Sequence, residues 1–216
     1  HINAQANNMK YTIGTTEGEF EPNSNNTVLK NKLCITTIEE MNEAETILLL
    51  KLYERIFEKE FNIEQLYFAT IQSWHRQWLK PIYEWGGELR TVDLSKDGFR
   101  FAAAQFLEIQ SSNFEKEFLS QYQNLNNLPH EHLVSFLAKS HVEFILIHPF
   151  REGNGRISRL LIDVMATQAG YHPLDYSLWD KHRDFYFRAI QAGVSGDYQH
   201  IERLIRDILP NQLLSK

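Results

Sequence analysis

The stretch HPFREGNGRISR at residues 148–159 joins two predicted helices and decides the fold around it. Upstream, apolar residues at helical spacing predict a buried helix over residues 133–147, and Pro149 ends that helix at His148. Downstream, apolar residues recur at i, i+3, i+4 and i+7 from Ile157 and predict a second helix. Between the helices, Gly153 and Gly155 permit positive φ angles, so that successive N–H groups can form an anion-binding concavity at a helix N-terminus.

The charged residues of this stretch suggest chemistry as well as binding. Arg156 and Arg159 lie in the first turn of the second helix, where cations oppose the helix dipole unless a polyphosphate binds there. Glu152 would repel that phosphate unless a cation such as Mg²⁺ bridged the two. His148 can take a proton from an attacking hydroxyl near neutral pH. The alternative is an interhelix loop with a capping acid, a buried histidine and two solvated arginines, but all of these features within twelve positions favour transfer of a phosphorus group.

The segment resembles the signature of the Fic family, His-Pro-Phe-x-(Asp/Glu)-Gly-Asn-Gly-Arg-x-x-Arg, and fills every specified position. The resemblance implies a protein adenylyltransferase, which moves AMP from ATP onto a Tyr, Thr or Ser hydroxyl of a target protein. The roles it implies are His148 as general base, Phe150 as the anchor of the loop, Glu152 as the Mg²⁺ ligand, Gly153, Asn154 and Gly155 as the cradle of the α- and β-phosphates, and Arg156 and Arg159 as ligands of the β- and γ-phosphates.

Two alternatives stay open at this point. One is another transfer on the same fold, of UMP, phosphocholine or a phosphoryl group; Doc-type relatives, which phosphorylate, depart from the signature where this chain keeps Gly153, Gly155 and Arg159. The other is a nucleotide-binding interaction module without catalysis, which would need neither His148 nor Glu152. A P-loop NTPase is excluded, because the sequence contains no Gly-x-x-x-x-Gly-Lys-(Ser/Thr) run.

A β-hairpin is predicted ahead of the signature, because residues 91–94 and 99–101 alternate around the turn residues 95–98. A packed surface hairpin is the plain interpretation. The resemblance implies instead a flap near the active site that holds the target by main-chain pairing, as a free strand edge can. The flap residues expected to bind the target are Val92, Asp93, Leu94 and Phe99.

The remaining pattern is helical. Thr37 and Glu40 form a capping box, and amphipathic stretches follow at about 37–60, 63–83, 102–120, 180–192 and 197–209, with a polar linker at 121–129. We therefore expect an all-α domain of about eight helices with one small hairpin, spanning residues 31–216. The segment Trp-x-Gly-x-x-Arg at residues 85–90 is similar to one that precedes the active site in Fic proteins. By the same resemblance Tyr186 would line the adenine pocket, although an ordinary core tyrosine is a close alternative.

Composition limits the setting. The length of 216 residues and the hydrophobic content of 43% are typical of one globular domain. The net charge of −6 argues against a nucleic-acid-binding surface spread over the whole domain. No apolar run is long enough to cross a membrane, and the single cysteine, Cys34, excludes an intrachain disulfide, so we expect a cytoplasmic protein. We interpret residues 1–30 as a polar N-terminal arm. We expect Met9 to be the natural start, so that residues 1–8 would not belong to the natural protein.

Restraint of the activity is a separate expectation. Many Fic proteins are held off by a glutamate in a (Ser/Thr)-x-x-x-Glu-(Gly/Asn) helix, which pairs with the second signature arginine. Here Glu17-Gly18 has Ile13 four positions earlier, and the Glu-Gly pair of the signature has His148. We therefore expect that no standard intrachain helix blocks Arg159, and that restraint comes from a separate small inhibitory, antitoxin-like protein or is absent. The exception is Glu17, which lies one residue out of register with this pattern and could still reach the site.

Overall fold

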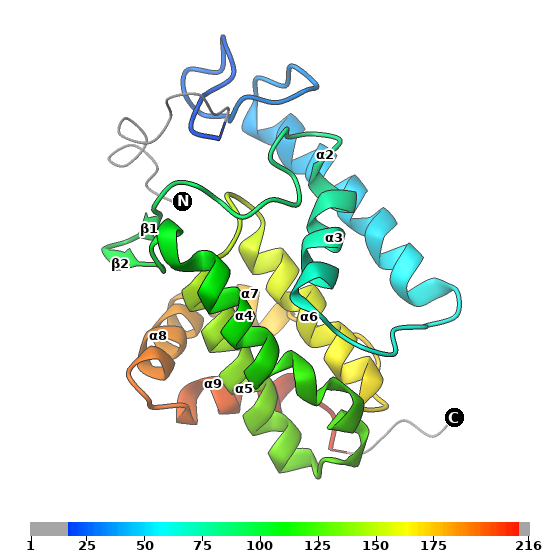
Figure 1. Ribbon diagram of the computed structural model, residues 1–216. Coiled ribbons are helices and arrows are strands. Elements are labelled where there is room, and N and C mark those ends of the chain that lie inside the picture. Colours follow the sequence, from blue (N-terminus) through cyan, green and yellow to red (C-terminus); the bar gives the residue numbers. More distant parts are fainter. Residues whose placement is uncertain (1–16, 212–216) are drawn as a thin grey trace.

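The computed structural model describes residues 17–211, and residues 1–16 and 212–216 lie outside the described part (Figure 1). Within it the chain is predominantly helical, with one two-stranded antiparallel hairpin, which confirms the predicted class. The elements are α2 (Ile38–Tyr53), a π-helical extension (Glu54–Glu58), α3 (Phe68–Leu79), β1 (Ser95–Lys96), β2 (Phe99–Arg100), a 3-10 turn (Ala104–Phe106), α4 (Leu107–Glu117), a 3-10 segment (Leu119–Asn127), α5 (His130–Ile147), α6 (Asn154–Gln168), α7 (Ser177–Lys181), α8 (Arg183–Val194) and α9 (Gln199–Ile208).

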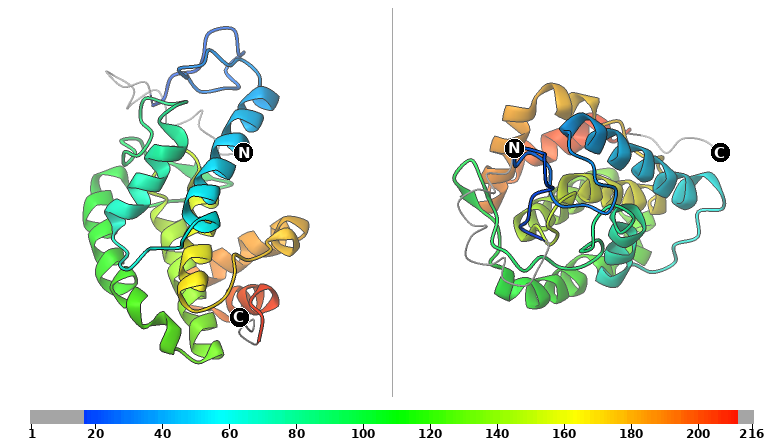
Figure 2. Two further views of the ribbon diagram at one scale, coloured as in Figure 1. Left: turned by 90° about the vertical axis from the view of Figure 1, so that its right-hand side faces the viewer. Right: turned by 90° about the horizontal axis from the view of Figure 1, so that it is seen from above.

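Helix α5 organises the packing. It contacts α4, α6, α8 and α9, while α3 contacts α2, α4 and α6. The α2–α3 pair and the α8–α9 pair therefore lie on opposite sides of α5 and α6, as the views in Figure 1 and Figure 2 show. The core side chains of α5 are fully buried, among them Val134, Leu137 and Phe144, because apolar positions recur around most of this helix.

Most predicted helices are present with shifted ends. Thr37 caps α2 through its hydroxyl, which accepts a hydrogen bond from the Glu40 amide at 3.3 Å. Helix α3 is shorter than the predicted 63–83, since it starts only at Phe68. The predicted linker at 121–129 is instead largely a 3-10 segment, because Tyr122 is buried and its hydroxyl donates to the Ile63 carbonyl at 2.8 Å.

The predicted hairpin was wrong in its register. Asp97 and Gly98, with φ of 49° and 80°, form the two central residues of a tight turn, and Ser95 pairs with Arg100. A two-residue turn with positive φ at both positions matches the twist of the strands, which favours it over the predicted four-residue turn. The predicted strand at 91–94 instead leads up to the hairpin as part of the core.

Residues 17–30, predicted as part of a separate arm, pack against the body of the domain. Val28 and Leu29 are buried in the main core, and directly after this segment the Lys32 amide donates to the Ile82 carbonyl at 2.7 Å. The rest of the predicted arm, including Met9, lies outside the described residues, and the domain boundary at residue 31 stays a prediction.

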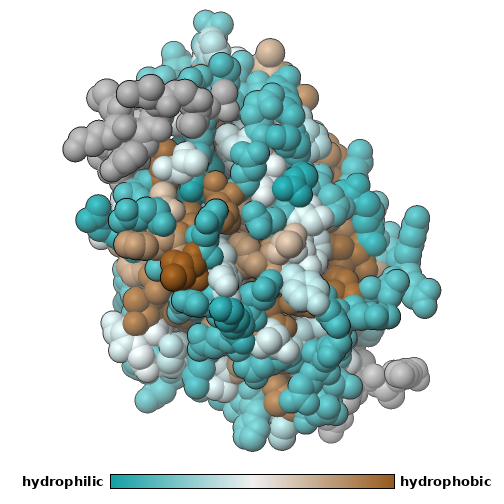
Figure 3. All heavy atoms as spheres, in the orientation of Figure 1, coloured by the Kyte–Doolittle hydropathy of each residue, from teal (hydrophilic) through white to brown (hydrophobic). Residues whose placement is uncertain are grey.

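The face shown in Figure 3 is mostly hydrophilic, with apolar residues in small groups. None of the helices between residues 17 and 211 combines the length and the hydrophobicity that crossing a bilayer requires.

Candidate active site

The loop between α5 and α6 is held in one shape by its own backbone and by Asn154. Helix α5 ends at Ile147, and its cap residue His148 has a left-handed φ of 49° and still donates its amide to the Phe144 carbonyl at 3.0 Å. Gly153 has a φ of 82° and is the cap residue directly before α6. The Asn154 side chain accepts from the Phe150 amide at 2.8 Å and donates to the Phe150 carbonyl at 2.7 Å. Asn154 therefore fixes the loop with its side chain, and its backbone is what remains available for a phosphate.

A buried histidine that the sequence reasoning missed supports this loop from below. His75 on α3 stacks on Phe150 at 3.9 Å between ring centroids. Its Nδ1 accepts the Gly87 amide at 2.8 Å, so Nε2 carries the proton and donates to the Glu152 carbonyl at 2.9 Å. Burial lowers the pKa of His75 to about 4, which keeps the ring neutral in this bridging role. The only signal in the sequence was its place between two tryptophans, Trp74 and Trp78.

Arg90, the last residue of the Trp-x-Gly-x-x-Arg segment, ties the loop to the hairpin. Its guanidinium donates to four backbone carbonyls, including those of His148 at 2.6 Å, Val92 at 2.7 Å and Ile147 at 3.1 Å. The fourth carbonyl belongs to Ala102, just after β2. Because one side chain bonds both segments, the hairpin base and the end of α5 are held at a fixed separation.

His148 faces the space between these segments. Its ring stacks on Phe101 at 3.7 Å between centroids, and within residues 17–211 neither ring nitrogen has a hydrogen-bond partner. Burial, and next the positive charge of Arg90, lower the pKa of His148 to about 3. The imidazole is therefore neutral at physiological pH and able to accept a proton. A buried ring without a hydrogen-bond partner destabilises the fold, so His148 is a candidate for a functional residue.

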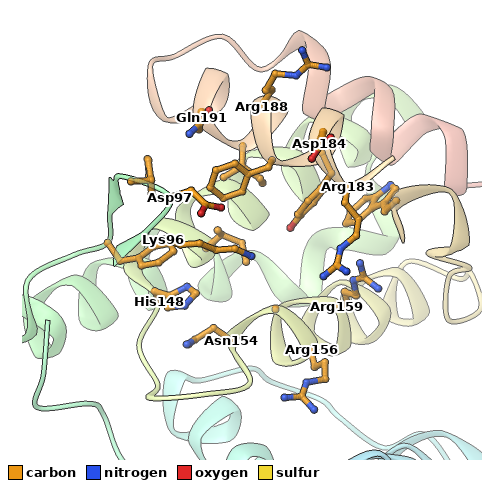
Figure 4. Close-up of a pocket in the computed structure, with 18 of the residues that line it drawn as sticks. Lys96, Asp97, His148, Asn154, Arg156, Arg159, Arg183, Asp184, Arg188 and Gln191 are labelled. Carbon is orange, nitrogen blue, oxygen red and sulfur yellow. The ribbon is translucent and has the colours of Figure 1, made fainter. Parts of the chain in front are cut away.

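A cavity of about 1140 Å³ opens in front of His148, between the hairpin, the start of α6 and α8 (Figure 4). Most of the predicted site residues line it together: Phe99, His148, Glu152, Gly153, Asn154, Gly155, Arg156, Arg159 and Tyr186. A Cβ added at Gly155 would meet no atom within 4 Å, so the space above this turn of α6 is open. A Cβ at Gly153 would lie 2.5 Å from the Trp78 ring.

The two signature arginines are engaged differently. Arg156 pairs with the buried Glu45 of α2 at 2.8 Å and stacks over Trp78 at 4.5 Å, and Figure 4 shows it pointing away from His148. Arg159 points toward α8 and pairs with Asp180 at 2.8 Å. Contact of Arg156 with phosphates stays a prediction, since it would require the arginine to leave Glu45. Sequence reasoning missed Glu45, whose signal was an acid inside the apolar stripe of α2.

Glu152 is the one predicted metal ligand, and its surroundings suit a cation shared with a ligand. Its carboxylate lies 3.3 Å from the Arg151 guanidinium, and burial raises its pKa above the ordinary value. No group of three or more potential metal ligands occurs among residues 17–211. A single carboxylate is what Mg²⁺ uses when substrate phosphates and water supply its other ligands, so the residues present fit a nucleotide-bound Mg²⁺.

The predicted flap residues divide into two groups. Phe99 lines the cavity and packs on Phe101 at 5.4 Å. The side chains of Val92 and Leu94 are both buried, and binding of the target by this segment stays a prediction. Asp93 lies outside this cavity, and its carboxylate caps the Ala104 amide at 2.8 Å.

Tyr186 lies in the cavity wall on α8. Its hydroxyl is 2.7 Å from Nε2 of the buried His141, and its ring stacks on Trp179 at 5.1 Å. The ring is thus held rigidly, and contact with an adenine stays a prediction.

The match to known proteins begins at α3. A family model described as Fic/DOC family matches residues 65–166, which contain α3, the hairpin, α5, the loop and all but the last two residues of α6. A curated relative that carries the name Fic aligns over 97 residues of this chain. Residues 65–166 of this chain therefore match the Fic family.

Among Fic proteins, a probable protein adenylyltransferase Fic from Salmonella typhimurium is 35% identical over 45% of this chain and 48% of its own length. The protein adenylyltransferase VbhT from Bartonella schoenbuchensis is 33% identical over 61% of this chain and 27% of its own. The chain thus spans about half or less of these relatives. A crystal structure of BepC from Bartonella tribocorum, with bound AMPPNP, has a TM-score of 0.72 and 26% identity, and covers 86% of this chain and 94% of that one.

The glutamate nearest to the Fic inhibitory pattern does not reach Arg159 in this chain. Glu17 is buried, and its carboxylate accepts from the Thr91 amide at 2.9 Å and from the Thr91 hydroxyl at 2.6 Å. Its carbonyl accepts from Arg151 at 3.0 Å. Glu17 therefore anchors the N-terminal segment to the hairpin base and the signature loop.

Proposed function

We propose that this chain is a protein adenylyltransferase, which transfers AMP from ATP to a Tyr, Thr or Ser hydroxyl of a target protein. The observation that carries the proposal is the imidazole of His148, which is neutral and has no hydrogen-bond partner among residues 17–211, and which lies beside the glycine loop at the wall of one cavity. The names of the curated relatives and the nucleotide analogue bound by BepC support it.

In the proposed reaction a target hydroxyl oxygen attacks the α-phosphorus of ATP. A new phosphorus–oxygen bond forms to the target, the bond from the α-phosphorus to the bridging oxygen breaks, and pyrophosphate leaves. The hydroxyl proton passes to a ring nitrogen of His148, which is neutral before the reaction because burial holds its pKa low. The negative charge of bound phosphates would strengthen this base, since a nearby anion favours the protonated ring.

The phosphates would lie on the N-terminus of α6. Backbone N–H groups at Gly153, Asn154 and Gly155 would hold them, helped by the dipole of that helix. Glu152 would hold Mg²⁺, which neutralises phosphate charge when bound. Arg159, and Arg156 if it leaves Glu45, would bind the phosphates of the leaving group.

The target would bind along the hairpin as an extended segment. Because the Phe101 amide donates to the Leu94 carbonyl at 3.1 Å, the alternating pattern of an antiparallel pair turns the N–H and C=O groups of Ser95 away from β2. A target strand could pair with that edge while its hydroxyl reaches His148.

We also propose a cellular location for the protein and a source of restraint on its activity. We place the protein in the cytoplasm because Cys34, its one cysteine, is free. We further propose that a separate small inhibitory protein restrains the activity, if anything does, because Glu17 is bound to Thr91.

Mass spectrometry of the modified product tests the proposal. The protein is incubated with Mg²⁺ and a cell lysate, once with ATP and once with UTP, and modified peptides are identified. The proposal predicts peptides that carry AMP on a hydroxyl side chain, formed with ATP. Peptides that carry UMP, phosphocholine or a bare phosphate instead would contradict it and support another transfer on this fold.

A further inference from the structure

A pair of arginines from separate segments meets at the end of the cavity that lies beyond the glycine loop. Arg159 projects from α6, and Arg183 is the first residue of α8. Figure 4 shows their guanidinium groups lying next to each other, although 24 positions separate them in the sequence. Arg183 is outside the signature.

The guanidinium of Arg159 is fixed in this position by three neighbours. It pairs with Asp180 at 2.8 Å and lies over the rings of Tyr176 and Trp179, at 5.1 and 5.9 Å from their centroids. The Asp180 side chain is 61% exposed, so the ion pair is of the weak, solvent-screened kind that another anion can displace.

Arg183 has no such compensation. Among residues 17–211 no carboxylate forms an ion pair with it, and it stands at a helix N-terminus, where a positive charge is unfavourable. The repulsion between two neighbouring guanidinium groups adds to this cost. An anion with more charge than one carboxylate would remove both conflicts.

The position of the pair fits the third phosphate of a nucleotide. Arg159 lies four residues beyond Gly155, which is about 6 Å further along α6 at ~1.5 Å per residue. A phosphate chain that starts on the loop N–H groups and follows α6 therefore arrives at Arg159 and Arg183. Arg156, by contrast, points away and is already neutralised by Glu45.

We propose that Arg183 is a second ligand of the terminal phosphate of the nucleotide, and that Asp180 is the counter-ion which this phosphate displaces from Arg159. The inference rests on the proposed function only for the identity of the ligand as a nucleoside triphosphate. It makes the end of the cavity a site that distinguishes ATP from ADP.

Calorimetric titration with two analogues tests it. α,β-Methylene-ATP cannot transfer AMP and keeps the γ-phosphate, while α,β-methylene-ADP lacks only that group. Arg183→Gln should weaken binding of the first roughly tenfold, as expected for loss of a charge-assisted hydrogen bond, and change binding of the second less than about twofold. Asp180→Asn should tighten binding of the first about two- to threefold, which is the scale of an exposed ion pair.

Two matched variants control for charge alone. Arg188→Gln removes a cation from α8, and Figure 4 shows the Arg188 side chain extending away from the pair. Asp184→Asn removes an acid from the same helix, α8. Both should change either affinity less than about twofold. Equal loss of the two analogues in Arg183→Gln, or an Asp180→Asn affinity that is unchanged or weaker, would overturn the inference. If the unmodified protein bound neither analogue, the proposed function itself would fail.

Discussion

The two glycines of the signature loop should separate folding from nucleotide binding. Gly155 lies in the first turn of α6, without a positive φ, and an added Cβ meets nothing within 4 Å. Gly155→Ala should therefore leave the free energy of unfolding unchanged or raise it by up to about 1 kcal/mol, because alanine favours a helix. The same methyl group would enter the space proposed for the phosphates. Loss of one charge-assisted hydrogen bond, about 1.5–3 kcal/mol, should weaken ATP binding by a factor of ten or more.

Gly153→Ala is the matched contrast, since there the glycine is required by the fold. Its φ of 82° costs other residues about 1–2 kcal/mol, and overpacking against Trp78, 2.5 Å from the new Cβ, adds about 1–3 kcal/mol. Urea unfolding should show a loss of about 2–5 kcal/mol for Gly153→Ala and none for Gly155→Ala. Calorimetry then measures ATP binding by the stable variant. Wild-type ATP affinity in a well-folded Gly155→Ala protein would refute the phosphate cradle.

Three further predictions follow from the site. His148→Ala should slow transfer by about 10²–10⁴-fold while ATP binding stays near wild type, since the base acts on the target hydroxyl; full activity would contradict its role. His75, His141 and His148 are buried with pKa values lowered to about 4, 3 and 3 from 6.5, so the unfolded chain binds protons first as the pH falls below 6.5. Between pH 6.5 and 5.5 the free energy of unfolding should drop by about 1 kcal/mol per histidine, about 3 kcal/mol in all, and a flat profile in urea titrations would disprove their neutral burial. Ser95→Pro removes an N–H group from the free edge of β1 and should reduce target modification more than ATP binding; equal loss of both would make the hairpin purely structural.

The helix pair around the signature could be predicted because its signals are local. Apolar spacing, Pro149 and the glycines all act within a few residues, and the structure ends α5 at Ile147 and begins α6 at Asn154. The hairpin was predicted in the right place with the wrong register. The pattern of alternating residues at 91–94 was compatible with a strand, and only burial of Val92 and Leu94 shows that it belongs to the core.

The parts of the site that escaped prediction depend on contacts between distant residues. His75 and Glu152 are 77 positions apart, and no local pattern links them. Glu45 and Arg156 come from α2 and α6, so their pairing appears only once those helices are packed around Trp78. The meeting of Arg159 with Arg183 likewise requires α8 to fold back over the cavity (Figure 4). A sequence motif fixes the chemistry of its own residues, whereas their supports are set by the tertiary structure.

The central claim is that the chain transfers the α-phosphate of ATP, together with its nucleoside, to a protein hydroxyl. Its most direct test is a pair of labelling reactions with Mg²⁺ and the same lysate, one with ATP labelled at the α-phosphate and one with ATP labelled at the γ-phosphate. The account predicts that protein becomes labelled only from the α-phosphate, and that His148→Ala abolishes the signal. Label that arrives from the γ-phosphate alone would contradict it and identify a phosphoryl transfer.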